Sequence, residues 1–123
     1  MADNMELSLE PEPTAAGRAR RAVAGIGLVD STQEPTLLLL VSELVSNSVK
    51  YGGDGAVTLQ VDAPSAGRVR VEVVDQGVGF VPVARNRPVT EVGGWGLHLV
   101  QTLANRWGVY EGSTHVWFEV RAD

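Results

Sequence analysis

Apolar positions recur with two periodicities along the chain, that of strands and that of helices, and the order of these segments predicts the elements of the fold. Apolar and polar residues alternate, as in half-buried strands, over residues 5–9, 56–63 and 68–75 and again within 108–122 around a turn at residues 111–113. Between them, residues 14–27, 31–50 and 96–107 carry apolar residues at helical spacing. The order β, α, α, β, β, loop, α, β, β predicts an α+β two-layer sandwich in which helices pack on one face of a mostly antiparallel sheet.

Capping signals refine the helix boundaries. Thr14 is a plausible N-cap for the first helix, which we expect to end near Gly25 or Gly27. Ser31 is expected to open the second helix, because Glu34 follows three residues later and completes a capping box. The third helix is expected to turn one apolar side to the core, formed by Leu97, Val100, Leu103, Ala104 and Trp107. Residues 77–94 hold glycines and prolines with little periodicity, which indicates a long loop.

Length and composition narrow the class of protein. With 123 residues, 44% of them apolar and 20% charged, the chain is expected to form one globular domain over residues 1–123. It has no apolar run long enough for a membrane span and no signal-peptide pattern, so we expect a cytoplasmic protein that does not bind a membrane. The absence of cysteine excludes disulfides and thiolate chemistry. The net charge of -5 argues against direct nucleic-acid binding, although it leaves room for a local basic patch.

The helix predicted over residues 31–50 has polar residues on a second side. Glu43, Asn47 and Lys50 project together, roughly opposite the apolar stripe that faces the core. An ordinary solvated face is one explanation. A binding site is the other, because a carboxamide oxygen suits Mg²⁺ and a carboxylate one turn earlier can orient or deprotonate a nucleophile. The apolar residues 38–40 favour the second explanation, since they make the first half of this helix apolar nearly all round.

Two glycine-containing segments add further candidate chemistry. In VVDQGVGF, Asp75 ends a strand, where its carboxylate can accept a hydrogen bond from an exocyclic amine, and Gly77 allows a sharp turn beside a flat ligand. In GGWGLHLV, a glycine-rich segment runs into a helix, an arrangement in which backbone N–H groups hold phosphate oxygens. Taken alone, the first segment is equally an ordinary Asp-Gly turn and the second a tight turn before a helix.

The order and spacing of the three segments resemble a known family. ELVSNSVKYG, DQGVGF and GGWGL are similar to the N box, G1 box and G2 box of the GHKL ATPase superfamily, whose members contain a histidine kinase-like ATPase domain. Within it, the chain most resembles the anti-sigma-factor serine kinases of bacteria, and the similarity covers nearly the whole sequence. The resemblance implies the Bergerat fold, an α/β sandwich with a mixed, mostly antiparallel sheet.

The resemblance also implies roles for individual residues, with ATP and Mg²⁺ as cofactors. Glu43 would be the catalytic acid of the N box, which acts as base or orienting group for the attacking hydroxyl, and Asn47 would hold Mg²⁺. Asp75 would pair with the adenine amine. The remaining implied contacts are the adenine pocket, shaped by Gly77 and Gly79, and phosphate-binding backbone at Gly94, Gly96 and Leu97. Lys50 is either a basic residue of this nucleotide site or a solvated lysine.

Three features depart from the family pattern or add nothing to it. Trp95 stands in the G2 box where many relatives have a polar residue, and it either alters the phosphate contacts or caps the pocket. Residues 80–93 would form a short nucleotide lid, in which Arg85 and Arg87 either reach the γ-phosphate or only increase solubility. His98 and His115 are expected to be neither ligands nor bases.

The GHKL subfamilies differ in the additional segments that their functions require, and these segments indicate which function the chain can have. A histidine kinase needs a helix pair that carries the acceptor histidine, which residues before 14 do not supply, and gyrase-like relatives need a following domain. We therefore expect an ATP-dependent protein serine/threonine kinase of the anti-sigma type, which phosphorylates a Ser or Thr of an anti-anti-sigma (STAS-type) protein. Its other expected partner is a sigma factor, so that partner switching regulates transcription. The alternative is a non-catalytic module that uses ATP to sequester a partner. Family analogy suggests a homodimer.

Overall fold

The order of helices and strands agrees with the one expected from the sequence. The computed structural model describes residues 4–27, 29–51, 55–63, 67–75, 94–110 and 115–121. The elements in chain order are β1 (Asn4–Leu9), α1 (Ala15–Ile26), α2 (Glu34–Tyr51), β2 (Val57–Asp62), β3 (Arg68–Val74), α3 (Gly94–Leu103), β4 (Arg106–Tyr110) and β5 (His115–Arg121). The loop expected over residues 77–94 lies outside the described residues apart from Gly94, as does the turn at 111–113.

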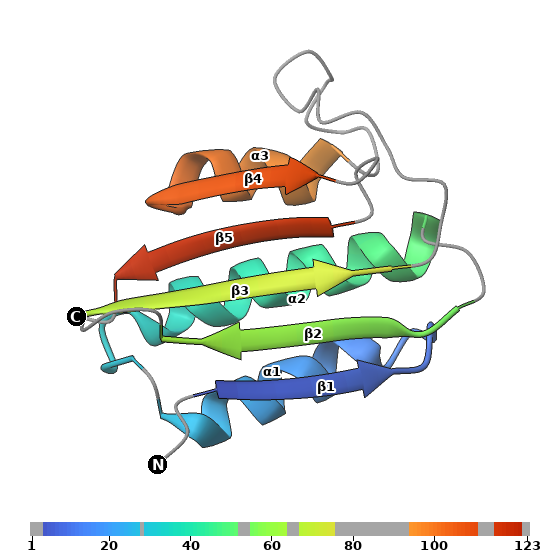
Figure 1. The fold of residues 1–123 in the computed structure, drawn as a ribbon, viewed down its shortest axis with the longest axis horizontal. Helices are drawn as coiled ribbons and strands as arrows, with labels where there is room; N and C mark the ends of the chain where they lie inside the picture. The colour runs from blue at the N-terminus through green and yellow to red at the C-terminus, as the bar shows by residue number, and fades with distance from the viewer. Residues whose placement is uncertain are drawn as a thin grey trace.

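The strands form one open sheet, and the helices cover one of its faces (Figure 1). The strand order is β1-β2-β3-β5-β4, and every pairing between neighbouring strands in this described sheet is antiparallel. Helix α2 lies in the centre, where it contacts β2 and β3 of the sheet and both other helices. The expected two-layer α+β sandwich is therefore confirmed.

The core lies between the sheet and the helices because the strands turn alternate residues towards it. The inward positions of β2, β3 and β5 are buried and apolar, and they face the apolar stripe of α2. Burying each of these side chains contributes about 1.5–3 kcal/mol to folding. The buried apolar residues of these four elements are Val57, Leu59, Val61, Val69, Val71, Val73, Val116, Phe118, Val120, Leu37, Leu40, Val41, Leu44 and Val45.

The first two helices begin and end close to the expected positions, with one correction. Helix α1 follows Thr14, but the Thr14 side chain makes no capping hydrogen bond, so the expected N-cap is present only by position. The helix ends at Ile26 and is followed by Gly27, whose φ of 69° is the left-handed conformation that glycine adopts without strain. At the start of α2, the side-chain oxygen of Asp30 accepts hydrogen bonds from the backbone N–H groups of Thr32 and Gln33, both at 3.0 Å. The expectation that Ser31 caps this helix is therefore wrong, because the carboxylate one residue earlier occupies that role.

Helix α3 is shifted towards the N-terminus relative to the sequence prediction. It spans Gly94–Leu103, whereas the apolar periodicity predicted a helix over residues 96–107. Trp107, expected on its core-facing side, instead belongs to β4. Asn105 explains the early end: its backbone N–H donates to the Glu119 carbonyl, and its side-chain oxygen accepts from the Arg121 N–H, both at 2.9 Å. These bonds tie the chain to β5 directly after the helix.

None of the helices within the described ranges combines the length and apolar character needed to cross a bilayer.

Candidate functional site

The polar side of α2 is not a uniform solvated face. Asn47 is only 7% exposed, Glu43 is half-buried and Lys50 is exposed. Asn47 is buried although it lies away from the sheet-facing stripe, because α2 also contacts α3 and is covered on more than one side. Among the described residues, Oε1 of Glu119 is the only buried side-chain oxygen or nitrogen without a hydrogen-bond partner, so Asn47 is not a buried amide that lacks one. What marks Asn47 as a candidate is its burial on the polar side of the helix, one turn after Glu43.

Asp75 also lies in a buried position, at the point where β3 ends. It directly follows Val74, the last residue of that strand, and is 7% exposed. A carboxylate held at this depth can accept a hydrogen bond from an amine of a ligand that reaches it. Gly77 and Gly79, expected to shape the adenine pocket beside it, lie outside the described residues.

The glycine-rich segment GGWG is partly helical rather than a turn that precedes a helix. Helix α3 starts at Gly94, so Gly94, Gly96 and Leu97 all lie in its first turn. The first four N–H groups of an α-helix have no partner within the helix, and the helix dipole makes this end positive. The three residues expected to contact phosphate therefore supply backbone donors at the end of a helix that suits an anion.

These three places lie at the same end of the molecule. In Figure 1, the last turns of α2, the end of β3 and the first turn of α3 all lie on the right. The close packing agrees with this view, since α2 contacts both α3 and β3. The sequence prediction that the polar side of the second helix, the strand-ending acid and the start of the last helix are neighbours is thus consistent with the arrangement of their elements.

Lys50 lies on the side of α2 that faces α1. It lines a small pocket of about 240 Å³ together with Ser46 and Val49 of the same helix and with residues 12, 13 and 16 at the start of α1. Lys50 is exposed, whereas Asn47, three residues earlier on the same helix, is buried. The assignment of Lys50 to the nucleotide site stays a prediction.

The donor set at this end of the molecule suits a nucleotide with its metal. A carboxylate acceptor, a carboxamide oxygen and a helix N-terminus match an exocyclic amine, a hard divalent cation and phosphate oxygens, respectively. No group of three or more His, Asp or Glu side chains that could hold a metal ion by itself occurs among the described residues.

Solved structures share this fold. The chain is similar to the structure of the RsbU and RsbW domains of Rv1364c from Mycobacterium tuberculosis, with a TM-score of 0.67 and 21% identity. It is also similar to the histidine kinase domain of the blue-light activated histidine kinase EL346 from Erythrobacter litoralis, with a TM-score of 0.50 and 22% identity. These matches cover 96% and 89% of the chain but only 31% and 59% of the two solved chains. No curated protein matches the sequence.

The family is established by a match over most of the sequence. The profile of the histidine kinase-like ATPase domain matches residues 9–120, which include Glu43, Asn47 and Asp75 as well as the start of α3. This match agrees with the three boxes and with the fold. The chain therefore belongs to the histidine kinase-like ATPase domain family and is an ATP-binding domain of the GHKL type.

Proposed function

We propose that the protein is an ATP-dependent protein serine/threonine kinase of the anti-sigma-factor type, with Mg²⁺ as its metal. The acceptor is a Ser or Thr of an anti-anti-sigma protein of the STAS type, and a sigma factor is the partner whose release this phosphorylation controls. The observation that carries the proposal is the burial of Asn47 and Asp75 on elements that meet at one end of the molecule, beside the first turn of α3.

Each group at this end has a role in the proposed reaction. ATP supplies the γ-phosphoryl group that is transferred. Asp75 accepts a hydrogen bond from the adenine amine, with Gly77 and Gly79 beside the ring, and the N–H groups of the first turn of α3 hold phosphate oxygens. Asn47 contributes its carboxamide oxygen to Mg²⁺. Phosphoryl transfer depends mainly on positioning and charge neutralisation, so this small set is sufficient.

Glu43 is the proposed catalytic residue. It lies one turn before Asn47 on α2 and is half-buried, so its carboxylate is on the same side of the helix as the proposed metal ligand. There it would orient the acceptor hydroxyl and take up its proton as the oxygen bonds to the γ-phosphorus, while the bond from that phosphorus to the β–γ bridging oxygen breaks and ADP leaves.

The test is transfer of label from radiolabelled ATP with Mg²⁺ to candidate anti-anti-sigma proteins. General-base catalysis contributes about 100-fold to 10,000-fold, so Glu43→Gln and Glu43→Ala should lower the transfer rate by roughly 100-fold or more. Both should retain ATP binding in calorimetric titration. The matched control is Glu34→Ala, which removes a carboxylate from the first turn of the same helix and should retain transfer.

One result would contradict the proposed kinase activity, and another would contradict only the role of Glu43. Tight ATP binding without transfer to any acceptor protein would favour the alternative, a module that sequesters its partner without phosphorylating it. Trp95 in the first turn of α3 is the sequence feature that favours this alternative. Transfer that persists at full rate in Glu43→Gln would retain the kinase and remove Glu43 from its mechanism.

A further inference from the structure

The face of the sheet that the helices leave open carries a group of arginines at one end. The strand register aligns Arg70 of β3, Glu119 of β5 and Arg106 of β4 in a single row across the sheet. Arg68 lies two residues before Arg70 on the same face of β3. We call Arg68, Arg70 and Arg106 the arginine cluster. It lies opposite the helices that carry the proposed nucleotide site (Figure 1).

One carboxylate holds the three guanidinium groups together. Glu119 is largely buried, with 9% of its side chain exposed, and its oxygens lie 3.4 Å from Arg70, 3.6 Å from Arg68 and 3.7 Å from Arg106. Only the Arg70 contact is a hydrogen bond. Three cations around one anion leave an excess of two positive charges. Glu119 therefore fixes the positions of the arginine cluster without neutralising it.

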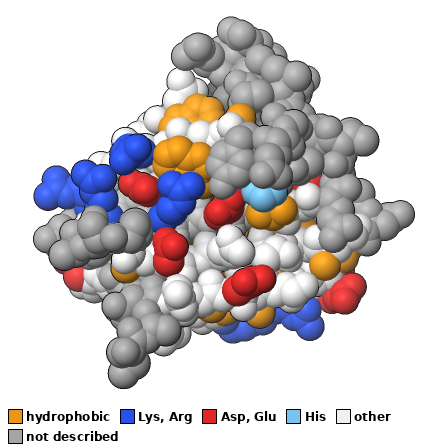
Figure 2. Space-filling view, in the orientation of Figure 1, with side chains coloured by type: hydrophobic (Ala, Val, Ile, Leu, Met, Phe, Trp, Pro, Cys, Tyr) orange, Lys and Arg blue, Asp and Glu red, His pale blue; other side chains and the backbone are white. Residues whose placement is uncertain are grey.

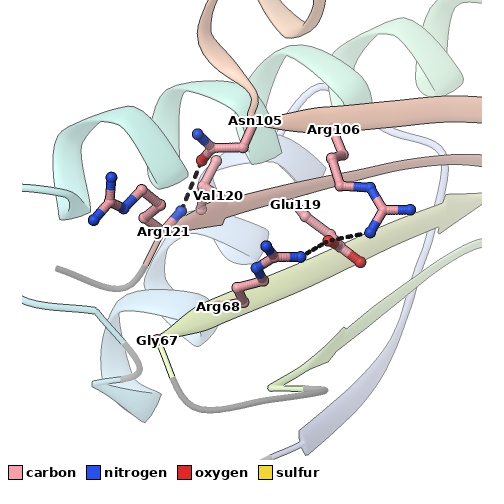
Figure 3. A pocket seen from close by; sticks show the side chains of 7 residues that line it. All are labelled: Gly67, Arg68, Asn105, Arg106, Glu119, Val120 and Arg121. Carbon is pink, nitrogen blue, oxygen red and sulfur yellow. Dashed lines mark hydrogen bonds and ion pairs between the residues drawn. The ribbon is translucent and has the colours of Figure 1, made fainter.

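The outer two arginines remain accessible to a ligand. The side chains of Arg68 and Arg106 are 52% and 61% exposed. In Figure 3 they approach Glu119 from opposite sides. A guanidinium carries several N–H donors in a planar fork that matches a carboxylate, and one shared carboxylate cannot satisfy both forks. These two residues therefore keep donors for an anionic group.

A hollow in the surface lies at the same place. A pocket of about 540 Å³ is lined by Arg68, Arg106 and Glu119, by Arg121 on its far side, and by Gly67 and Asn105 at its rim (Figure 3). Asn105 is held by its hydrogen bond from the Arg121 backbone N–H, so this part of the pocket is fixed by the end of β5. The pocket gives an anionic side chain a place to enter between strands.

The neighbouring aromatic residue favours a protein as the ligand. The Arg70 guanidinium carbon lies 4.2 Å from the centre of the Trp117 ring, and this tryptophan is only partly buried. Arginine and tryptophan side by side on an open surface are the residue types that dominate protein–protein binding energy. A free inorganic anion would gain nothing from the indole, and half-exposed arginines hold a single small ion weakly because water and salt screen them.

The distribution of charge argues against a nucleic acid. The same face carries three further acidic residues at outward positions: Asp62, the cross-strand partner of Arg70, and Glu6 and Glu72 further along the strands. Figure 2 shows basic side chains gathered on the left of this face, with acidic side chains among them and further along the face. An extended polyanion that follows the sheet would meet these carboxylates, and the whole chain is acidic, with a net charge of -5. A short acidic segment fits within the cationic end.

We propose that the arginine cluster and its pocket bind an acidic segment of a partner protein, whose Asp or Glu side chains pair with Arg68 and Arg106. This interaction surface is separate from the nucleotide site and does not depend on the proposed kinase activity. Several carboxylates on one segment engage the cluster at once, so each contact after the first is made at a high local concentration.

The test measures binding of a fluorescein-labelled peptide of alternating Glu and Gly to the full chain by fluorescence anisotropy at low and physiological salt. A charge-assisted hydrogen bond is worth about tenfold or more in affinity, so Arg106→Glu and Arg68→Glu should each weaken peptide binding by about tenfold. The matched control is Arg18→Glu on α1, which removes an arginine of similar exposure, 49%, that is also ion-paired to a glutamate. It should leave binding unchanged.

Milder variants keep the result interpretable if charge reversal disturbs folding. Arg106→Gln and Arg68→Gln retain a polar side chain at the same positions and should weaken binding in proportion to the lost charge, with unchanged circular dichroism. A peptide of Lys and Gly should not bind at the cluster. Selective loss in the Arg68 and Arg106 variants, together with full binding by Arg18→Glu, supports the proposal.

Each other outcome overturns it. Equal loss in Arg18→Glu would mean that the peptide responds only to overall charge. Displacement of the peptide by inorganic phosphate at matched concentration would identify a small-anion site. Tighter binding of duplex DNA than of the peptide, lost in the same variants, would identify a nucleic-acid surface. A change in oligomeric state by sedimentation, without peptide binding, would make this face an interface between two copies of the chain.

Discussion

At the residue scale, Asn47 is the side chain that the proposed function uses most directly. It is buried, with 7% of the residue exposed, and lies one turn after Glu43 on α2. A carboxamide oxygen is a hard ligand of the kind that suits Mg²⁺. If Asn47 holds the metal as proposed, its removal should affect the metal complex of ATP more than ATP alone.

The first prediction concerns this amide. Asn47→Ala should weaken the binding of Mg-ATP by at least about tenfold, because even residues that only support a metal ligand contribute about 10-fold to 100-fold to metal affinity. ATP without metal should lose much less affinity. Calorimetric titration with and without Mg²⁺ measures both. Ser46→Ala is the control, since Ser46 is on the same helix but lines the pocket beside α1. An equal loss for both forms of ATP would reject the metal assignment.

Gly108 is a second residue whose identity follows from its surroundings. A Cβ atom added there would lie 2.8 Å from Nε1 and 3.0 Å from Cε2 of Trp117, which is closer than such atoms approach in proteins. Trp117 cannot easily move away, because Arg70 stacks on its ring at 4.2 Å. Glycine at position 108 thus allows the indole to lie across β4.

Gly108→Ala should therefore reduce the free energy of unfolding by about 1–3 kcal/mol, the usual cost of overpacking, measured by urea denaturation. The control is Gly25→Ala in α1, where nothing lies within 4 Å of the added Cβ. That change should be neutral or stabilise the protein by up to about 1 kcal/mol, because alanine has the higher helix propensity. Equal effects at both positions would mean that the indole is not held against β4.

At the scale of elements, the start of α2 has two candidate N-caps, Asp30 and Ser31, whose contributions to stability can be compared. Asp30→Ala should lower the free energy of unfolding by about 1 kcal/mol, since it removes the acceptor for two backbone N–H groups. Ser31→Ala should change it by less than about 0.5 kcal/mol, the usual range for surface positions. Urea denaturation of both variants measures the difference. The reverse order would restore the capping box that the sequence suggested.

The elements also show which parts of the fold were accessible from the sequence. The strands were predicted well because alternation has a short period and each strand buries one face. The end of α3 was missed because Trp107 continues the helical spacing, while the bonds of Asn105 to Glu119 and Arg121 come from a strand that follows later in the chain. Long-range hydrogen bonds of this kind leave no mark in local periodicity.

The candidate functional residues also divide into those that local sequence motifs indicate and those that only long-range contacts bring together. Glu43, Asn47 and Asp75 were predicted from boxes with a fixed order, and their roles stay predictions, as do those of Gly77 and Gly79, which lie outside the described residues. The arginine cluster was not identified, since its members come from two separate segments. The signal was present in part: Arg68 and Arg70 alternate on one strand, but their grouping with Arg106 around Glu119 requires the register of β3, β5 and β4.

At the scale of the whole molecule, the two faces of the sheet have different chemistry. The helix side encloses the core and carries the buried polar residues Asn47 and Asp75 at one end. The open side carries the arginine cluster at the end where β3 and β4 begin and β5 finishes (Figure 1). The buried valines and phenylalanine of the sheet separate the two surfaces, so a ligand on one face makes no direct contact with a ligand on the other.

This separation predicts that nucleotide binding and substitutions in the arginine cluster have additive effects on the free energy of unfolding. A ligand that binds only the folded state adds about 2.7 kcal/mol at a concentration 100 times its Kd, so Mg-ATP should raise the Tm of the chain. Arg106→Glu should retain this increase, because substitutions at distant sites without shared partners are additive within about 0.5 kcal/mol. Asn47→Ala should reduce it. Thermal unfolding followed by circular dichroism measures all three, and a loss in Arg106→Glu as large as that in Asn47→Ala would show that the faces are coupled through the sheet.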